Sequence, residues 1–231
     1  MKRFYKDVGV TQAAGGWQVT LDARALRTVG GAQQIVPSKA LAEALAQEWD
    51  AQGEKIDPKS MPLRDMVDYA VDVVAADPAA VITSTLAYGD TDTLLYRADP
   101  DEAIYAQQIA VWEPIVARFE ADRSVQMVRV SGIVHRPQSP ETLDILRGEL
   151  EALSPYELAA TQAMASLAAS LVIALSVKAD KDDPEALWQA ASLEEEWQAD
   201  EWGRDEEAEE RRAKRARDFL KSCEMLRLAR G

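Results

Sequence analysis

The spacing of apolar residues changes near residue 36, and this change constrains the fold more than any other feature of the chain. Up to that point, short apolar runs alternate with polar residues on either side of a Gly15-Gly16 turn, which predicts antiparallel strands. Beyond it, apolar residues recur at helical spacing. The predicted fold class is α+β, with a small N-terminal antiparallel β-rich domain (1–55) packed on a larger, mainly α-helical domain (56–231).

Prolines mark the helices of the second part. A proline fits the first turn of a helix because the N–H that it lacks has no intrahelical partner there. Pro114 instead lies inside an apolar pattern and is expected to kink or end its helix. The uncharged run Leu158–Val177 is predicted to be one helix buried on all sides. The prolines expected to open helices, five of them preceded by a capping Asp or Ser, are Pro62, Pro78, Pro100, Pro140, Pro155 and Pro184.

The first helix is expected from Ser38 to Gly53. Leu41, Leu45 and Trp49 are spaced four residues apart in it, so they share one face. That spacing predicts a structural role for all three side chains, with Trp49 in the core.

The run from Leu193 to Glu210 combines two tryptophans with many carboxylates and is predicted to be one helix. Trp197 continues an apolar line along it and is expected to be structural. On an ideal helix Trp202 lies about 140° from Trp197, so the two rings cannot share one core stripe.

Trp202 shares its predicted face with Glu195 and Glu206, which differ from it by seven and four positions. Two interpretations remain open. In one, a second helix or loop covers Trp202; in the other, the face is a recognition surface for a protein partner, with Glu194 beside it.

A second stretch of polar residues lies around Asp92 and Arg97. The structural interpretation is that Asp92 caps a turn, while Arg97 pairs with Asp90 or Asp92. The alternative is that Asp92 and Arg97 contact a partner.

The charge and the motifs exclude several functions. The 231 residues carry a net charge of −14, whereas nucleic-acid binding needs a basic surface. The sequence has no phosphate-binding loop, GxSxG motif, dinucleotide glycine pattern or CxxC motif. With His135 the only histidine and Cys223 the only cysteine, we predict no catalytic residue, no cofactor and no metal. A carboxylate-rich, metal-binding helical enzyme and an acidic adaptor for an unrelated client remain alternatives.

The N-terminus has no signal-peptide or transit-peptide pattern, and a lone cysteine fits a reducing compartment. The uncharged run Leu158–Val177 is too rich in alanine and serine to favour a bilayer. We expect a soluble, cytoplasmic monomer with no membrane insertion.

Several short motifs, in this order, resemble the family of ATP synthase assembly chaperones that escort the alpha subunit of the catalytic head. Two positions depart from the family pattern: Glu209 stands where members commonly have histidine, and Ala23 stands where a turn usually has glycine. The motifs are Arg3-Phe4-Tyr5-Lys6, Trp17-x-Val19-x-Leu21-Asp22-x-Arg24, Val36-Pro37-Ser38, Glu48-Trp49-Asp50-x-Gln52, Met61-Pro62-Leu63, Thr91-Asp92-Thr93-Leu94-x-Tyr96-Arg97-Ala98 and Leu193-Glu194-Glu195-x-x-Gln198-x-x-x-Trp202-Gly203.

The resemblance implies a β-rich N-terminal domain joined to a helical domain, no enzymatic activity, and binding to the unassembled alpha subunit. It further implies that the chaperone shields the alpha surface that later contacts a beta subunit, and it suggests a bacterial member of the family.

Overall fold

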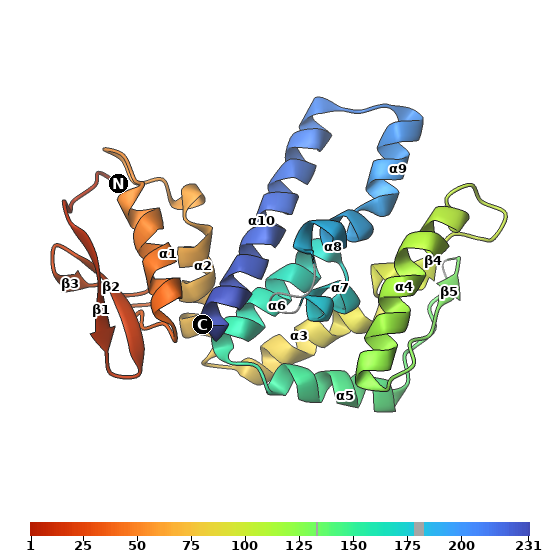
Figure 1. The fold of residues 1–231 in the computed structure, drawn as a ribbon, viewed down its shortest axis with the longest axis horizontal. Helices are drawn as coiled ribbons and strands as arrows, with labels where there is room; N and C mark the ends of the chain where they lie inside the picture. The colour runs from red at the N-terminus through yellow and green to blue at the C-terminus, as the bar shows by residue number, and fades with distance from the viewer. Residues whose placement is uncertain (133, 178–182) are drawn as a thin grey trace. The chain divides into compact units, whose positions relative to one another are not determined.

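The computed structural model describes residues 1–132, 134–177 and 183–231. A three-stranded antiparallel sheet lies at the N-terminus, and the remainder is mainly helical (Figure 1). The predicted α+β class is therefore confirmed.

The described residues form two compact units. Residue 55, the expected domain boundary, falls inside the first of them, because the helix that follows it packs on the helix that precedes it. The first unit comprises Met1–Pro78, Leu153–Ala160 and Lys221–Gly231, and the second comprises Ala79–Ala152 and Thr161–Leu220.

The sheet of the first unit has the order β1-β2-β3, with β1 (Val8–Ala13), β2 (Gly16–Leu21) and β3 (Arg24–Ala25). Asp22 and Ala23 join β2 to β3 with φ angles of 48° and 64°, as a tight hairpin turn requires. Asp22 Oδ1 accepts hydrogen bonds from the backbone N–H groups of Lys6 and Asp7, both at 2.9 Å, which lower the pKa of its carboxyl. These bonds tie the N-terminal segment to the turn.

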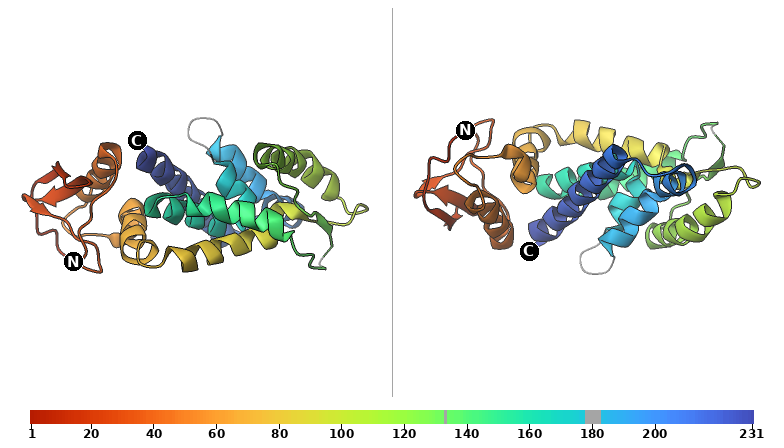
Figure 2. Two further views of the ribbon diagram at one scale, coloured as in Figure 1. Left: turned by 90° about the horizontal axis from the view of Figure 1, so that it is seen from below. Right: turned by 90° about the horizontal axis from the view of Figure 1, so that it is seen from above.

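Helix α1 (Lys39–Asp50) covers the sheet (Figures 1 and 2). It begins where the Ser38 side chain caps the Leu41 N–H at 3.0 Å. The face predicted from the sequence points inward: Leu41 and Leu45 are buried, and Trp49 is 8% exposed.

The rest of the first unit is helical. Glu48 of α1 accepts hydrogen bonds from the N–H groups of Leu63 and Arg64 at 2.9 Å, which satisfies two free donors in the first turn of α2. Burial raises the pKa of the Glu48 carboxyl despite these bonds. The elements are η1 (Pro58–Ser60), α2 (Pro62–Tyr69) and the π-helical turn η2 (Ala70–Val74).

The two later segments of the first unit are fixed by specific bonds. Tyr156 donates a hydrogen bond to the Ile35 carbonyl, and Arg230 pairs with Glu157 at 2.8 Å. Ser154 and Glu157 form a capping box at the helix start that Pro155 marks.

The remaining elements follow the predicted prolines closely. Helices open at Pro62, Pro78, Pro140, Pro155 and Pro184, whereas turns follow Pro100. In chain order the elements are α3 (Pro78–Asp90), η3 (Thr93–Leu95), β4 (Tyr96–Arg97), α4 (Tyr105–Arg123), β5 (Val130–Ser131), α5 (Pro140–Glu151), α6 (Pro155–Ala168), α7 (Leu171–Ser176), α8 (Pro184–Ala191), α9 (Leu193–Trp202) and α10 (Glu206–Arg230).

One helix prediction was wrong, and a second is narrowed to one of its two outcomes. The run 158–177 is not one helix, because Ala169 adopts a φ of 47° and Ser170 caps a new helix, α7. Pro114 does not end its helix, since α4 continues through it to Arg123. Within the part of the chain that the structure describes, no single helix is long and apolar enough to span a membrane.

Candidate functional site

Helix α9 ends at Trp202, so the single helix predicted over 193–210 was wrong. Gly203 has φ 98° and ψ 153°, a conformation that only glycine adopts readily. Asp205 then caps the Ala208 N–H at 2.9 Å, and α10 begins at Glu206. The sequence held signals for this break, namely a glycine after the last apolar residue and a capping Asp before an acidic first turn.

We call α9, residues 203–205 and α10 as far as Arg215 the α9–α10 fork, which lies within the second unit (Figure 1). Its two helices run in different directions, so Glu206 does not share a helix face with Glu195 and Trp202 as predicted. Glu206 is exposed at the start of α10.

The Trp202 side chain is 77% exposed at the tip of α9. Among the described residues no second helix or loop covers Trp202, so the first of the two interpretations is wrong, while the recognition surface stays a prediction. The ring is in edge-on contact with Trp197, the centroids lying 6.4 Å apart. Trp197 itself is only half-buried, although the apolar line predicted a core position.

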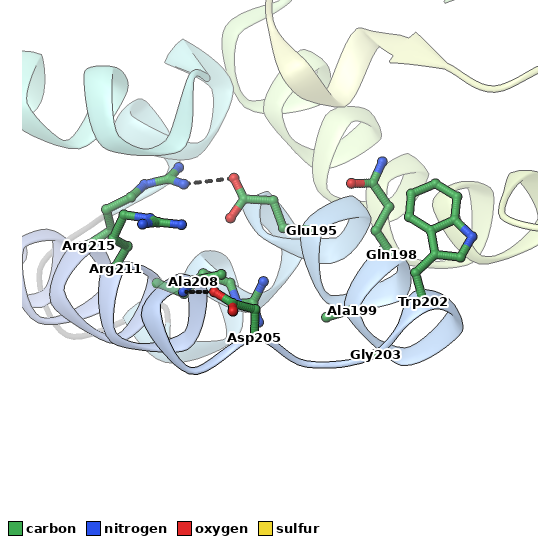
Figure 3. Close-up of a pocket in the computed structure, with 10 residues that line it drawn as sticks. Glu195, Gln198, Ala199, Trp202, Gly203, Asp205, Ala208, Arg211 and Arg215 are labelled. Carbon is green, nitrogen blue, oxygen red and sulfur yellow. Dashed lines mark hydrogen bonds and ion pairs between the residues drawn. The ribbon is translucent and has the colours of Figure 1, made fainter.

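A pocket of about 380 Å³ lies inside the fork (Figure 3). Glu195, Gln198 and Trp202 line it from α9, and Arg211 and Arg215 line it from α10. The pocket thus places an exposed aromatic ring and charged groups of both signs around one opening.

Ion pairs hold the two arms of the fork together. Glu195 pairs with Arg215 at 2.7 Å, and Arg215 also donates to the Leu167 carbonyl at 2.8 Å. Arg204 bonds Glu196 at 3.0 Å and Asp200 at 2.6 Å. Because these groups are substantially exposed, the pairs contribute little to stability and chiefly fix the geometry of the fork.

Glu201 in α9 and Glu206 in α10 differ from the paired carboxylates of the fork. Both are exposed, and neither forms an ion pair with another residue in the described ranges. An exposed tryptophan beside such carboxylates suits a partner that offers an apolar pocket with basic groups around it.

Glu194 faces away from solvent. It is half-buried and accepts a hydrogen bond from Gln108 Nε2 at 2.6 Å, while Gln108 Oε1 accepts the Ala98 N–H at 2.9 Å. Burial raises the pKa of the Glu194 carboxyl. This geometry makes Glu194 a support for the start of α9.

Asp92 and Arg97, the other predicted contacts, are buried, so this structure offers neither side chain to a partner. Arg97 does not pair with Asp90 or Asp92 as expected. Its Nη2 atom lies 2.7 Å from Glu113 of α4, and its Nε donates to the Leu94 carbonyl at 3.3 Å. Sequence spacing could not identify Glu113 as the partner of Arg97, because only the tertiary fold brings α4 next to Arg97.

Among the residues described, no group of three or more His, Cys, Asp or Glu side chains could hold a metal ion. Several carboxylates of the fork are instead paired with arginines, Glu194 is bonded to Gln108, and Glu201 and Glu206 are exposed.

Gly203→Ala tests the break between α9 and α10. An added Cβ would meet nothing within 4 Å, so the cost comes from the backbone alone. We expect the free energy of unfolding to fall by about 1–3 kcal/mol. Gly148→Ala, at an open position inside α5, is the control and should raise stability by about 0.5–1 kcal/mol. Chemical denaturation measures both, and a Gly203→Ala variant as stable as wild type would contradict the assignment.

Comparison with known proteins shows which protein family the chain resembles. The family model described as "ATP12 chaperone protein" matches residues 2–120. "Protein atp12, mitochondrial" from Schizosaccharomyces pombe is 26% identical over 221 residues, which cover 90% of this chain and 76% of the relative.

Solved structures extend the likeness to the fork. Atp12 from Paracoccus denitrificans is 37% identical with a TM-score of 0.93, covering 99% of this chain and 98% of that one. The Atu1473 protein from Agrobacterium tumefaciens, a putative chaperone, is 38% identical with a TM-score of 0.93, covering 98% and 85%.

The chain is therefore a chaperone. It belongs to the ATP12 chaperone family, and the resemblance to ATP synthase assembly chaperones carried by its motifs is confirmed.

Proposed function

We propose that this chaperone binds the unassembled alpha subunit of the ATP synthase catalytic head and shields the surface that later contacts a beta subunit. It does so without catalysis, as a monomer in the bacterial cytoplasm. Membership of the family supports the assembly role, and the solved relatives from bacteria support the setting. The observation that carries the proposal is the exposed Trp202 at the α9–α10 fork.

The fork supplies the chemistry that a transient client complex needs. A tryptophan exposed to 77% can bury a large apolar area on binding, and residues of this type dominate the affinity of protein interfaces. We assign Glu195 and Glu206 to polar contacts around it. Carboxylates at the rim favour fast, reversible association, so the true assembly partner can displace the chaperone. Glu194, Asp92 and Arg97 hold the framework behind this surface.

Trp202→Ala is the first test. Truncation of a central interface tryptophan costs about 2–4 kcal/mol, so we expect capture of purified alpha subunit to weaken about 30-fold or more. Thermal stability should stay within about 0.5 kcal/mol of wild type, because the side chain is exposed. The control is Val29→Ala, which removes an equally exposed apolar group in the first unit and should bind normally. Wild-type binding by Trp202→Ala would refute the proposed contact.

Charge reversal tests the two carboxylates. Glu206→Lys should weaken client capture and suppression of aggregation while leaving thermal stability nearly unchanged, since Glu206 has no ion-pair partner among the described residues. Glu195→Lys also breaks the ion pair with Arg215. The double variant Glu195→Lys/Arg215→Glu, which again places opposite charges at the two positions, is therefore its control. The double variant should recover the stability that the ion pair supplies, though not the Arg215 bond to the Leu167 carbonyl, and should remain deficient in capture. Normal capture by Glu206→Lys and by the double variant would leave the acidic residues as a solubility feature.

A further inference from the structure

Phe4 is held out into solvent by two anchored neighbours. Arg3 bonds the Asp50 carbonyl at 3.0 Å, and the Tyr5 hydroxyl donates to the Trp49 carbonyl at 2.6 Å. Phe4 lies between them, is 62% exposed, and contacts the Tyr5 ring edge-on at 5.3 Å between centroids. The function proposed for the α9–α10 fork does not involve Phe4.

A pocket of about 450 Å³ opens beside Phe4, entirely within the first unit. Tyr5 and Leu21, both buried, lie in its lining with the half-buried Leu26. The pocket is thus an open end of the core that the sheet forms with α1, large enough for one apolar side chain.

The backbone beside the pocket is an open sheet edge. Thr20 of β2 lies opposite Ala25, and the neighbouring Leu26 N–H donates to the Val19 carbonyl at 3.0 Å. Because successive residues of an antiparallel strand point their N–H and C=O groups to opposite sides, those of Ala25 point away from β2. β3 is the outer strand of the sheet, and such an edge can pair with an added strand.

The rim of this pocket is basic. Arg24 and Arg27 line it and are exposed, and among the described residues neither forms an ion pair. Asp22 is the one carboxylate of the lining, and its Oδ1 atom is already occupied by two backbone N–H groups. Residues 1–60 carry eight Lys or Arg against seven Asp or Glu, in a protein with a net charge of −14. The local charge therefore favours an acidic occupant.

We propose that this site, the Phe4 pocket, binds a short extended segment of an acidic polypeptide. One apolar side chain of the segment enters the pocket beside Phe4, its backbone pairs with Ala25, and flanking carboxylates meet Arg24 and Arg27. The isolated bridge between Arg27 and Gln33 limits the pairing to two or three residues of the segment. Binding of this segment does not require the alpha subunit, so the proposal does not depend on the function proposed for the fork.

A synthetic seven-residue peptide tests the site. The probe alternates glutamate and valine around a central phenylalanine, and its two comparators replace glutamate with lysine or phenylalanine with serine. We expect the acidic probe to bind the full-length protein saturably and to slow amide exchange at Ala25, while each comparator binds about tenfold more weakly or worse. Equal binding of the lysine peptide, or unchanged exchange at Ala25 with saturating probe, would overturn the proposal.

Variants locate the binding on the protein. Phe4→Ser and Arg24→Glu/Arg27→Glu change exposed side chains, and each should weaken the probe about tenfold. The melting temperature should stay unchanged in Phe4→Ser, whereas the double variant also loses the Arg27 bond to the Gly31 carbonyl at 2.7 Å. Val29→Ser, at a residue 83% exposed in the same unit, is the control and should bind normally. Full binding by Phe4→Ser would place the peptide elsewhere and refute the site.

Discussion

Trp49→Ala is expected to reduce the free energy of unfolding by about 3–5 kcal/mol, because it removes a buried aromatic side chain and leaves a cavity. Trp49 is 8% exposed in the core of the first unit, and its ring lies edge-on to Tyr5 with 5.7 Å between centroids. Leu41 and Leu45 lie on the same face of α1. Chemical denaturation followed by circular dichroism measures the loss.

Two controls make this test specific. Trp49→Phe should cost much less, since the Trp49 indole N–H has no hydrogen-bond partner among the described residues and phenylalanine keeps most of the apolar area. Trp202→Ala removes the same side chain from an exposed position and should cost less than about 0.5 kcal/mol. If Trp49→Ala melts like wild type but fails to bind the alpha subunit, Trp49 is a contact residue and the structural assignment is wrong.

Asp92→Ala is expected to destabilise the second unit by about 3–5 kcal/mol, because it leaves several buried donors without an acceptor. Asp92 is fully buried. Its Oδ1 accepts from the Leu94 N–H at 3.0 Å and the Ser170 hydroxyl at 2.7 Å, and its Oδ2 accepts from the Val172 N–H at 2.8 Å. One carboxylate thus caps both η3 and α7, which are far apart in the sequence.

Asp92→Asn is the matched variant, since its amide keeps one acceptor oxygen and should cost less than alanine. Burial raises the pKa of Asp92 to about 6, so below that pH the folded state binds a proton that the unfolded chain does not. The contribution of this group to stability is therefore complete below its unfolded pKa and is lost as pH rises through 6. The stability gap between wild type and Asp92→Asn should widen as pH falls from 7 to 5, and a constant gap in denaturation curves would contradict this linkage.

Local chemistry in the sequence predicted a large part of the fold. The Ser38 start of the first helix and the four-residue spacing of the α1 face depend on neighbouring residues, and the structure has both; the hairpin turn predicted at Gly15-Gly16 lies one residue earlier, at Ala14-Gly15. The helix start predicted at Pro100 was wrong, because a proline that begins a turn satisfies the same local rule as one that begins a helix. The break at Ala169 had only a weak local signal, since alanine favours helix and the Ser170 cap gains its strength from the buried Asp92 network.

The candidate site was less predictable than the fold. Helical spacing placed Glu195, Trp202 and Glu206 on one face, but Gly203 turns the chain between them. The partner of Glu195 is Arg215, twenty residues away, and the partner of Arg97 is Glu113 on another helix. Such pairs depend on the path of the chain through the tertiary structure, which periodicity does not encode. The exposed position of Trp202 likewise follows from its place at the very end of α9.

Direct binding to the alpha subunit tests the central claim. Purified chaperone and unassembled alpha subunit, mixed without nucleotide and separated by size, should co-elute as a discrete complex, while beta subunit alone should not co-elute with the chaperone. If the chaperone and the beta subunit occupy the same alpha surface, as we propose, addition of beta subunit to the complex should release the chaperone as alpha and beta associate. Failure of wild-type chaperone to form a complex with alpha subunit, or equal capture of alpha by wild type and Trp202→Ala, would contradict the account.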